Sequence, residues 1–244
     1  MAAFAAAVDL GYRYLETDVH ATADGVLIAF HDDRLDRLTD RSGLVAELPW
    51  AEIRQARVGG REPIVVFEEL LRTFPEARIN VDPKHDAAVP LLIRAMRDPG
   101  IAARLCIGSF SDRRVAEIRG AIGQAGCTAL GPWEIAALRA GAWGAGSLLS
   151  RLRRRPGRCV QIPQWGRGGI PLVEPRLLAA AHKLGLPVHV WTINEPDEMR
   201  RLLDLGVDGL FTDRPAILRS VLGERGSWFA ADAGAAASAD LESG

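Results

Sequence analysis

The order of apolar residues constrains the fold more than any other feature of this sequence. Between Tyr12 and Leu222, short apolar runs alternate with longer stretches whose apolar residues recur every three or four positions. The runs are typical of parallel strands covered on both faces, and the stretches are typical of amphipathic helices. Strand-then-helix units repeated over about 210 residues predict an α/β protein with a parallel sheet, arranged as a (β/α)8 TIM barrel. A doubly wound open sheet is the alternative, but no glycine-rich phosphate loop follows any predicted strand.

Seven strands are predicted, whereas a barrel of this type has eight. The chain opens with Met1–Leu10, whose alanine-rich composition favours a helix. This helix has no strand before it, so we expect the first barrel strand to be missing from this chain. The predicted strands are Tyr14–Val19, Ala77–Asp82, Leu105–Phe110, Thr128–Gly131, Cys159–Ile162, Val188–Ile193 and Gly209–Thr212.

The helices between the strands have recognisable start and stop signals. Asp86 and Ser111 are predicted N-caps, and Gly185 and Gly206 stand where helices should end. The predicted helices are Asp86–Arg97, Ser111–Ile122, Glu174–Leu184 and Pro196–Leu205.

Residues 16–32 form a β-hairpin excursion from the strand-and-helix pattern. Two extended segments are joined by Asp24-Gly25, which favours a two-residue type I′ turn. A parallel crossover needs a dozen or more residues, so the second segment cannot be the next barrel strand. A two-residue turn pairs Asp18 with His31, and paired side chains share a face. A bulge would shift this register by one residue.

Composition limits the domain organisation and the class of partner. The 244 residues carry 30 basic and 31 acidic side chains, for a net charge of −1, which excludes a basic nucleic-acid-binding surface. No apolar stretch reaches the ~18 residues of a transmembrane helix, and we expect a cytoplasmic protein. Residues 1–222 are predicted to form the barrel domain, and residues 223–244 a disordered tail rich in Ala, Ser and Asp.

Three cysteines occur, at Cys106, Cys127 and Cys159. They are too few and too scattered along the sequence for a disulfide framework or a cysteine-based zinc site. We expect them to be buried thiols in a reducing compartment.

Polar residues stand at the carboxyl ends of the predicted strands, where TIM barrels carry their active sites. Glu16 and Asp18 end one strand, and Asp82 ends the next, close to Lys84. Three carboxylates in one cavity repel each other, which a hard cation with oxygen ligands, Mg²⁺ or Ca²⁺, would relieve. Lys84 and this metal could hold a phosphate, with His31 as general acid or base. Other strand ends carry Ser109, Gln161, Trp191, Asn194, Thr212 and Asp213.

Simpler interpretations exist for these residues when each is taken alone. Asp82 could cap a helix or bind a loop, and His31 could be a hydrogen-bonded loop histidine. Asp32 and Arg37 are expected to form a solvated turn with a salt bridge. The combination of two acids and a histidine on one hairpin face favours a site over these alternatives.

Several segments together resemble the glycerophosphodiester phosphodiesterases. The resemblance runs from the first helix to about residue 222. It is carried by Leu15-Glu16-Thr17-Asp18-Val19, Thr22-Ala23-Asp24-Gly25, His31-Asp32 with Leu35 and Arg37, Asn80-Val81-Asp82-Pro83-Lys84, Gly108-Ser109-Phe110, Val190-Trp191-Thr192-Ile193-Asn194 and Thr212-Asp213-Arg214-Pro215.

The resemblance implies a metal-dependent TIM barrel of lipid and glycerol metabolism. Its members cleave glycerophosphodiesters, which are small-molecule substrates, to glycerol 3-phosphate and an alcohol. In this chain the implied metal ligands are Glu16, Asp18 and Asp82, the last standing where the family has a glutamate. The implied roles of the other residues are one of two catalytic histidines for His31, a phosphate contact for Lys84 and a pocket-lining aromatic for Trp191.

The sequence departs from the family at its beginning. Family members start with a strand ending in His-Arg-Gly, which supplies the second catalytic histidine and a phosphate-binding arginine, and no His-Arg-Gly occurs here. Two interpretations stay open: a first strand encoded upstream of Met1, or a remnant that binds phosphodiesters without turnover. In either case we expect the 244-residue chain to have little or no diesterase activity.

Overall fold

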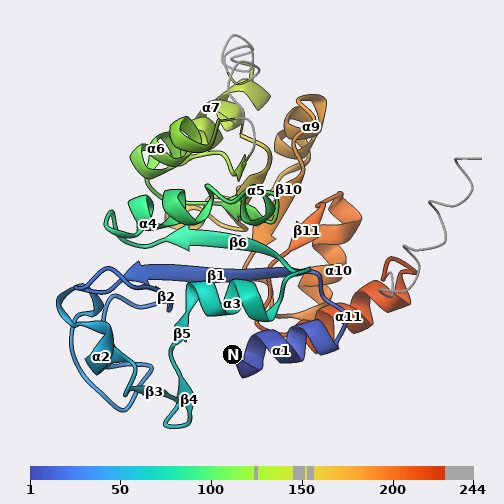
Figure 1. Ribbon diagram of the computed structural model, residues 1–244. Coiled ribbons are helices and arrows are strands. Elements are labelled where there is room, and N and C mark those ends of the chain that lie inside the picture. The colour runs from blue at the N-terminus through green and yellow to red at the C-terminus, as the bar shows by residue number, and fades with distance from the viewer. Residues whose placement is uncertain (124–125, 145–151, 153–156, 229–244) are drawn as a thin grey trace, which may run out of the picture.

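Seven parallel strands lie side by side in the same order as they occur along the chain, and helices connect them (Figure 1). The protein is represented by a computed structural model that describes residues 1–123, 126–144, 152 and 157–228. All seven predicted strands are confirmed, several with shorter bounds. They are β1 (Tyr14–Ala21), β6 (Arg78–Pro83), β7 (Leu105–Ile107), β8 (Cys127–Thr128), β9 (Val160–Pro163), β10 (Val188–Trp191) and β11 (Gly209–Leu210).

The strands pair in two sheets that meet at one seam. A six-stranded sheet begins with two short strands, β5 (Val65–Val66) and β2 (Leu27–Ala29), and continues with β1, β6, β7 and β8. A three-stranded sheet has the order β11-β10-β9. A parallel bridge between Ala129 and Cys159 continues the strand order from β8 to β9. Among the described residues no ladder joins β11 to β1, so the barrel is open there. The predicted α/β barrel fold is confirmed, in this open form.

Helices surround the strands, and most begin at a residue type that favours a helix start. Proline occupies the first turn of α5, α7, α9, α10 and α11, where its missing N–H costs nothing. Ser111 caps α6 as predicted, but Asp86 does not cap α4; its carboxylate instead forms ion pairs with Arg113 and Arg114. The helices are α1 (Ala2–Asp9), α3 (Phe67–Thr73), α4 (Ala88–Ala95), α5 (Pro99–Ala102), α6 (Asp112–Ile122), α7 (Pro132–Ala142), α9 (Pro175–Lys183), α10 (Pro196–Leu205) and α11 (Pro215–Glu224).

The apolar cores lie between the strands and the helices. Successive strand residues point to opposite faces, so one face of each strand can be apolar while the other carries polar groups. Ile79 and Val81 of β6 belong to the core beneath α3 and α4, and Val188 and Val190 of β10 belong to a second core around α9 and α10. The opposite faces of these strands are left for polar side chains inside the barrel.

The segment between β1 and α3 forms a small unit of its own. It contains β2 (Leu27–Ala29), η1 (Val45–Glu47), α2 (Trp50–Ile53), β3 (Arg57–Val58), β4 (Glu62–Pro63) and β5 (Val65–Val66). In Figure 1 much of this segment lies away from the barrel strands. It has a separate core of buried side chains: Ile28, Phe30, Leu35, Val45, Ile53, Ala56 and Ile64.

The hairpin at Asp24 and Gly25 is confirmed, but its predicted type I′ turn is wrong. Thr22 N donates to Val26 O at 2.9 Å, so three residues form the loop, with Gly25 in the left-handed conformation at φ 79°. The register therefore shifts by one residue. Asp18 lies opposite Phe30, whose N–H donates to the Asp18 carbonyl, and not opposite His31.

The packed part of the chain extends past the predicted boundary at residue 222. That position lies inside α11, and beyond it Trp228 contacts Tyr12 edge to face, with 4.8 Å between ring centroids. Residues 229–244, most of the predicted tail, lie outside the described residues. No helix in the described ranges is long and apolar enough to cross a membrane.

A buried ion pair fastens α6 to α7. Arg119 donates to both carboxylate oxygens of Glu134 at 2.8 and 3.0 Å, and also to Thr128 Oγ1 and the Ala129 carbonyl. The two side chains are only 12% and 9% exposed. The guanidinium depends on the carboxylate to balance its charge away from water.

We expect Glu134→Ala to lower the free energy of unfolding by about 3–5 kcal/mol, because it leaves the Arg119 charge buried and unpaired. Urea denaturation measures this change. The control is Asp204→Ala, which breaks the exposed pair with Arg225 and should cost about 1 kcal/mol or less. Equal losses in both variants would contradict the assignment.

Candidate active site

The acidic residues meet because of the register between β1 and β6. Asp18 is the direct parallel partner of Asp82, and Glu16 is the partner of Asn80. Directly paired residues point to the same face, and alternate residues of one strand do so as well. Glu16, Asp18 and Asp82 therefore all line the barrel interior near the carboxyl ends of the strands. The register thus puts the three predicted carboxylates on one face, and their role as metal ligands stays a prediction.

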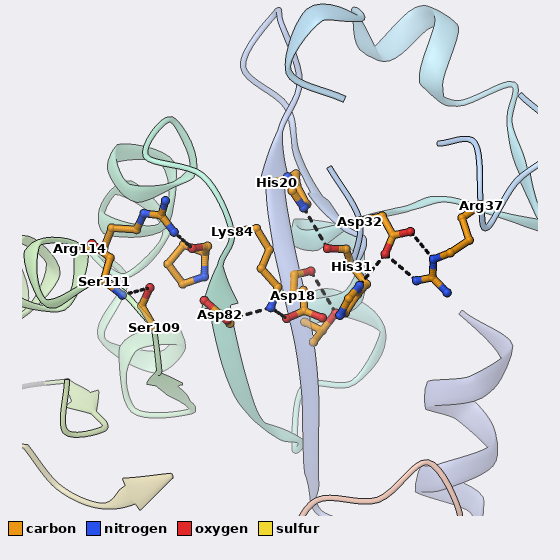
Figure 2. Close-up of polar contacts among 12 residues, drawn as sticks. Asp18, His20, His31, Asp32, Arg37, Asp82, Lys84, Ser109, Ser111 and Arg114 are labelled. Atoms are coloured by element: carbon orange, nitrogen blue, oxygen red, sulfur yellow. Dashed lines mark hydrogen bonds and ion pairs between the residues drawn. The ribbon is translucent and has the colours of Figure 1, made fainter. Parts of the chain in front are cut away.

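Lys84 lies between the two aspartates (Figure 2). Its Nζ is 2.6 Å from Asp18 Oδ1 and 2.9 Å from Asp82 Oδ2. Burial works to lower the pKa of Lys84, but the two ion pairs outweigh burial and raise that pKa. The ammonium group is therefore charged at neutral pH and neutralises part of the acidic cluster.

Two of the carboxylates are difficult to ionise in this setting. Loss of solvation raises the pKa of Asp82, and the ion pair with Lys84 only partly opposes this change. Glu16 reaches solvent in the open interior, yet the surrounding strands displace enough water to raise its pKa to about 7, with a further contribution from the Asp18 charge. The cluster therefore has negative charge that Lys84 does not fully balance.

His31 is oriented by its neighbour in sequence. Its Nδ1 lies 2.6 Å from Asp32 Oδ1, and Arg37 binds both oxygens of the same carboxylate at 2.6 and 2.7 Å. The Arg37 guanidinium and the His31 ring hold the pKa of Asp32 down at about 2. With Nδ1 engaged, Nε2 is the nitrogen available for proton exchange. The predicted Asp32–Arg37 salt bridge is present, and Asp32 also fixes the imidazole.

His31 is carried by a different segment of the chain from Asp18 and Asp82, as Figure 2 shows. The imidazole is 64% exposed and follows β2, whereas Asp18 belongs to β1. Because of the register shift, His31 is not on the same paired rung as Asp18. It reaches the same end of the barrel by the path of the chain after the hairpin.

The sequence analysis missed His20, the next residue on the Glu16 and Asp18 face. It is buried, its Nε2 lies 3.2 Å from the His31 carbonyl, and burial lowers its pKa. The signal was available, because strand alternation puts residues 16, 18 and 20 on one face. His20 fixes the backbone that carries the exposed imidazole.

The other predicted strand-end residues form aromatic contacts or hydrogen bonds with their neighbours. Trp191 contacts Phe110 edge to face, with ring centroids 5.6 Å apart, and these rings form an aromatic wall. Asn194 accepts hydrogen bonds from Thr212 Oγ1 and Asp213 N and donates to the Asp213 carboxylate. Gln161 on β9 donates to Asn80 on β6, and Ser109 accepts from Ser111 N within its own loop.

The donor set suits a hard divalent cation. Glu16, Asp18 and Asp82 offer carboxylate oxygens, the ligands that Mg²⁺ and Ca²⁺ prefer. The pKa values of Glu16 and Asp82 are raised chiefly by loss of solvation, and the neighbouring Asp18 charge adds to both shifts. Asp82 already attracts one cation, the Lys84 ammonium, as does Asp18. The residues present therefore fit such an ion.

Comparison with known proteins gives one consistent family. The profile of the "Glycerophosphoryl diester phosphodiesterase family" matches residues 1–217. A Mycobacterium tuberculosis relative named "Probable glycerophosphodiester phosphodiesterase 2" is 39% identical over 93% of this chain and 86% of its own length.

Solved structures share the fold. A Silicibacter pomeroyi protein assigned to the same family has a TM-score of 0.74 and 26% identity, over 93% of this chain and 88% of the other. An Oleispira antarctica phosphodiesterase, solved in complex with the product sn-glycerol-3-phosphate, has a TM-score of 0.70 and 20% identity, over 91% and 89% of the two chains. At that identity the second likeness concerns the fold alone.

The raised pKa of Glu16 makes stability depend on pH. Its folded-state pKa of about 7 exceeds the ordinary 4.5, so the folded protein holds this proton more tightly than the unfolded chain. The resulting stability is present below pH 4.5 and is lost as the pH rises through 7. We expect Glu16→Gln to match the parent below pH 4.5 and to melt at a higher temperature above pH 7.

Thermal melts in chelator-treated buffer test this expectation. Glu117→Gln, on the exposed face of α6, is the control and should show no such pH-dependent gain. A constant difference between Glu16→Gln and the parent at every pH would overturn the assignment.

Proposed function

The chain belongs to the glycerophosphoryl diester phosphodiesterase family, and from this premise we propose that its function is hydrolysis of glycerophosphodiesters to glycerol 3-phosphate and an alcohol. The expected low activity of residues 1–244 is a separate prediction, which the assay described below also tests. The observation that carries the proposal is the ion-paired cluster of Asp18, Lys84 and Asp82, beside which Figure 2 shows the Asp32-bound imidazole of His31. Cationic and acid–base groups at one end of a barrel are what phosphodiester cleavage requires. The activity belongs to lipid and glycerol metabolism.

We also propose that Glu16, Asp18 and Asp82 hold a divalent metal ion, Mg²⁺ or Ca²⁺. When bound, such an ion supplies positive charge for a phosphate oxygen and lowers the pKa of bound water. Glu16 and Asp82 must then lose the protons that their raised pKa values favour. Metal affinity should therefore increase with pH in the range up to about 7.

The remaining roles follow from position and charge. The Lys84 ammonium is charged at neutral pH and attracts the phosphate. Its side chain can turn from the two aspartates toward the substrate. His31 exchanges a proton through Nε2 with a reacting oxygen, while Asp32 and Arg37 hold the ring in place. Trp191, with Phe110, offers an apolar edge to the carbon part of the diester.

Release of glycerol 3-phosphate from glycerophosphocholine, in the presence of Mg²⁺ or Ca²⁺, tests the proposed reaction. Product formation that depends on the chain and on the metal supports it. Binding of the diester without turnover would instead support a phosphodiester-binding barrel. If the chain neither binds nor hydrolyses any glycerophosphodiester, both functions are rejected.

His31→Ala should lower kcat by about 10²–10⁴-fold, the usual contribution of one acid–base group. Asp32→Asn should have a smaller effect, because it misorients the ring and does not remove it. The matched control is His182→Gln, since His182, in the last turn of α9, forms a similar pair with Asp208 at 2.8 Å. An unchanged kcat in His31→Ala, or an equal loss in the control, would contradict the role of His31.

The metal ligands are tested by thermal shift. Metal at 100 times its Kd stabilises the folded state by about 2.7 kcal/mol, and this gain should vanish in Glu16→Gln and Asp18→Asn. Glu117→Gln should keep it. If both site variants are stabilised by Mg²⁺ or Ca²⁺ as strongly as the parent, these carboxylates are not ligands.

A further inference from the structure

Three cysteine sulfurs meet inside the barrel. Cys106 Sγ lies 2.9 Å from Cys127 Sγ and 3.7 Å from Cys159 Sγ, and all three sulfurs lie within 4.8 Å of one another. All are free thiols. The sequence analysis excluded a cysteine-based metal site because these residues are far apart along the chain. The reason for that exclusion does not hold, because the fold brings the three residues together.

Strand register explains the meeting. Cys106 on β7 is the direct parallel partner of Cys127 on β8, and Ala129, two residues further, is bridged to Cys159 just before β9. Residues two apart and residues directly paired share a face. The neighbours Leu105 and Ile107 point the other way, into the core under the helices. All three sulfurs are therefore directed to the interior.

The cluster is separate from the acidic site. Cys106 is paired with Asn80, which precedes Asp82 by two residues on β6. At a rise of about 3.3 Å per strand residue, Cys106 lies one layer, roughly 6–7 Å, further from the carboxyl ends than Asp82. Glu16 is on the same layer as Cys106, but β6 lies between the strands that carry the two residues. The two sites also differ in chemistry, because one offers hard oxygen donors and the other offers soft sulfur donors.

The cysteines also lie at the seam between the two sheets. Cys106 and Cys127 belong to the six-stranded sheet, and Cys159 precedes the first strand of the three-stranded sheet. Around the Ala129–Cys159 bridge, the described contacts are hydrogen bonds from Leu130 N to the Cys159 carbonyl and from Arg158 N to the Thr128 carbonyl. A ligand held by all three sulfurs would join the sheets.

The sulfur geometry favours a metal ion over a disulfide. Ligands about 2.3 Å from a tetrahedral zinc are roughly 3.8 Å apart, close to the Cys106–Cys159 separation of 3.7 Å. A disulfide between Cys106 and Cys127, whose sulfurs are 2.9 Å apart, would leave the Cys159 sulfur, 3.7 Å from Cys106, without a role. Cys106 and Cys127 are partly exposed, which gives an ion a path to the cluster.

We propose that Cys106, Cys127 and Cys159 bind one thiophilic metal ion, Zn²⁺, which fastens the two sheets at their seam. The three thiols lose their protons to solvent as the three Zn–S bonds form. Water completes the tetrahedron, and no electron is transferred.

Titration of the reduced, metal-free full chain with Co²⁺, a coloured substitute for Zn²⁺, tests the site. We expect one ion per chain with an intense thiolate-to-cobalt absorption band, and displacement of this band by Zn²⁺. Cys106→Ser, Cys127→Ser and Cys159→Ser should each lose or strongly weaken the band. The control Ile107→Val changes the same strand on its opposite face and should keep it.

Further experiments distinguish metal binding at the cysteines from metal binding at the acidic cluster. Asp18→Asn should keep the thiolate band, so failure of the proposed diesterase would leave this proposal standing. In the unmodified chain, Zn²⁺ should slow alkylation of all three thiols and raise the melting temperature, a readout that needs no serine variant to fold. Absence of the band, or thiols that Zn²⁺ leaves unprotected, would overturn the proposal. So would a Cys106–Cys127 disulfide that forms in air and that saturating Zn²⁺ does not prevent.

Discussion

The parallel pairing of β1 with β6 is the constraint on which the site depends. It places Asp18 directly opposite Asp82, and two like charges on one rung of a sheet repel each other. Lys84 lies within ion-pair distance of both carboxylates and relieves part of that repulsion. The remaining negative charge opposes folding, and the same charge would attract the divalent ion proposed above.

Much of the architecture is readable from the sequence, and the reasons are local. The strands are readable because apolar residues recur on one face, as Val188 and Val190 do in β10. Helix α10 spans its predicted residues because Pro196 starts it and Gly206 ends it. The acidic cluster is readable as well, since strand ends meet at one edge of a parallel sheet.

The hairpin register and the cysteine cluster were not predicted, because both depend on contacts between residues that the sequence does not show to be neighbours. Thr22 Oγ1 accepts from Val26 N, and Asp24 is bound by Thr22 and by Trp50 N, so the hairpin loop gains one residue. No dipeptide rule includes those bonds, and the predicted partner of Asp18 was therefore displaced by one residue. The cysteine cluster was missed for a related reason: spacing along the chain says nothing about which residues share a rung on neighbouring strands.

The small core between β1 and α3 has a consequence for how the protein responds to heat. His31 and Asp32 are carried by a segment whose buried side chains, among them Phe30 and Leu35, pack with one another rather than within the barrel cores. Such a segment can open as a local cooperative unit while the rest of the chain keeps its structure. The imidazole would then lose its place with the barrel still folded. Proton transfer by His31 would then cease at the temperature where the segment between β1 and α3 opens. That temperature would be lower than the one at which the strands carrying Asp18 and Asp82 unfold.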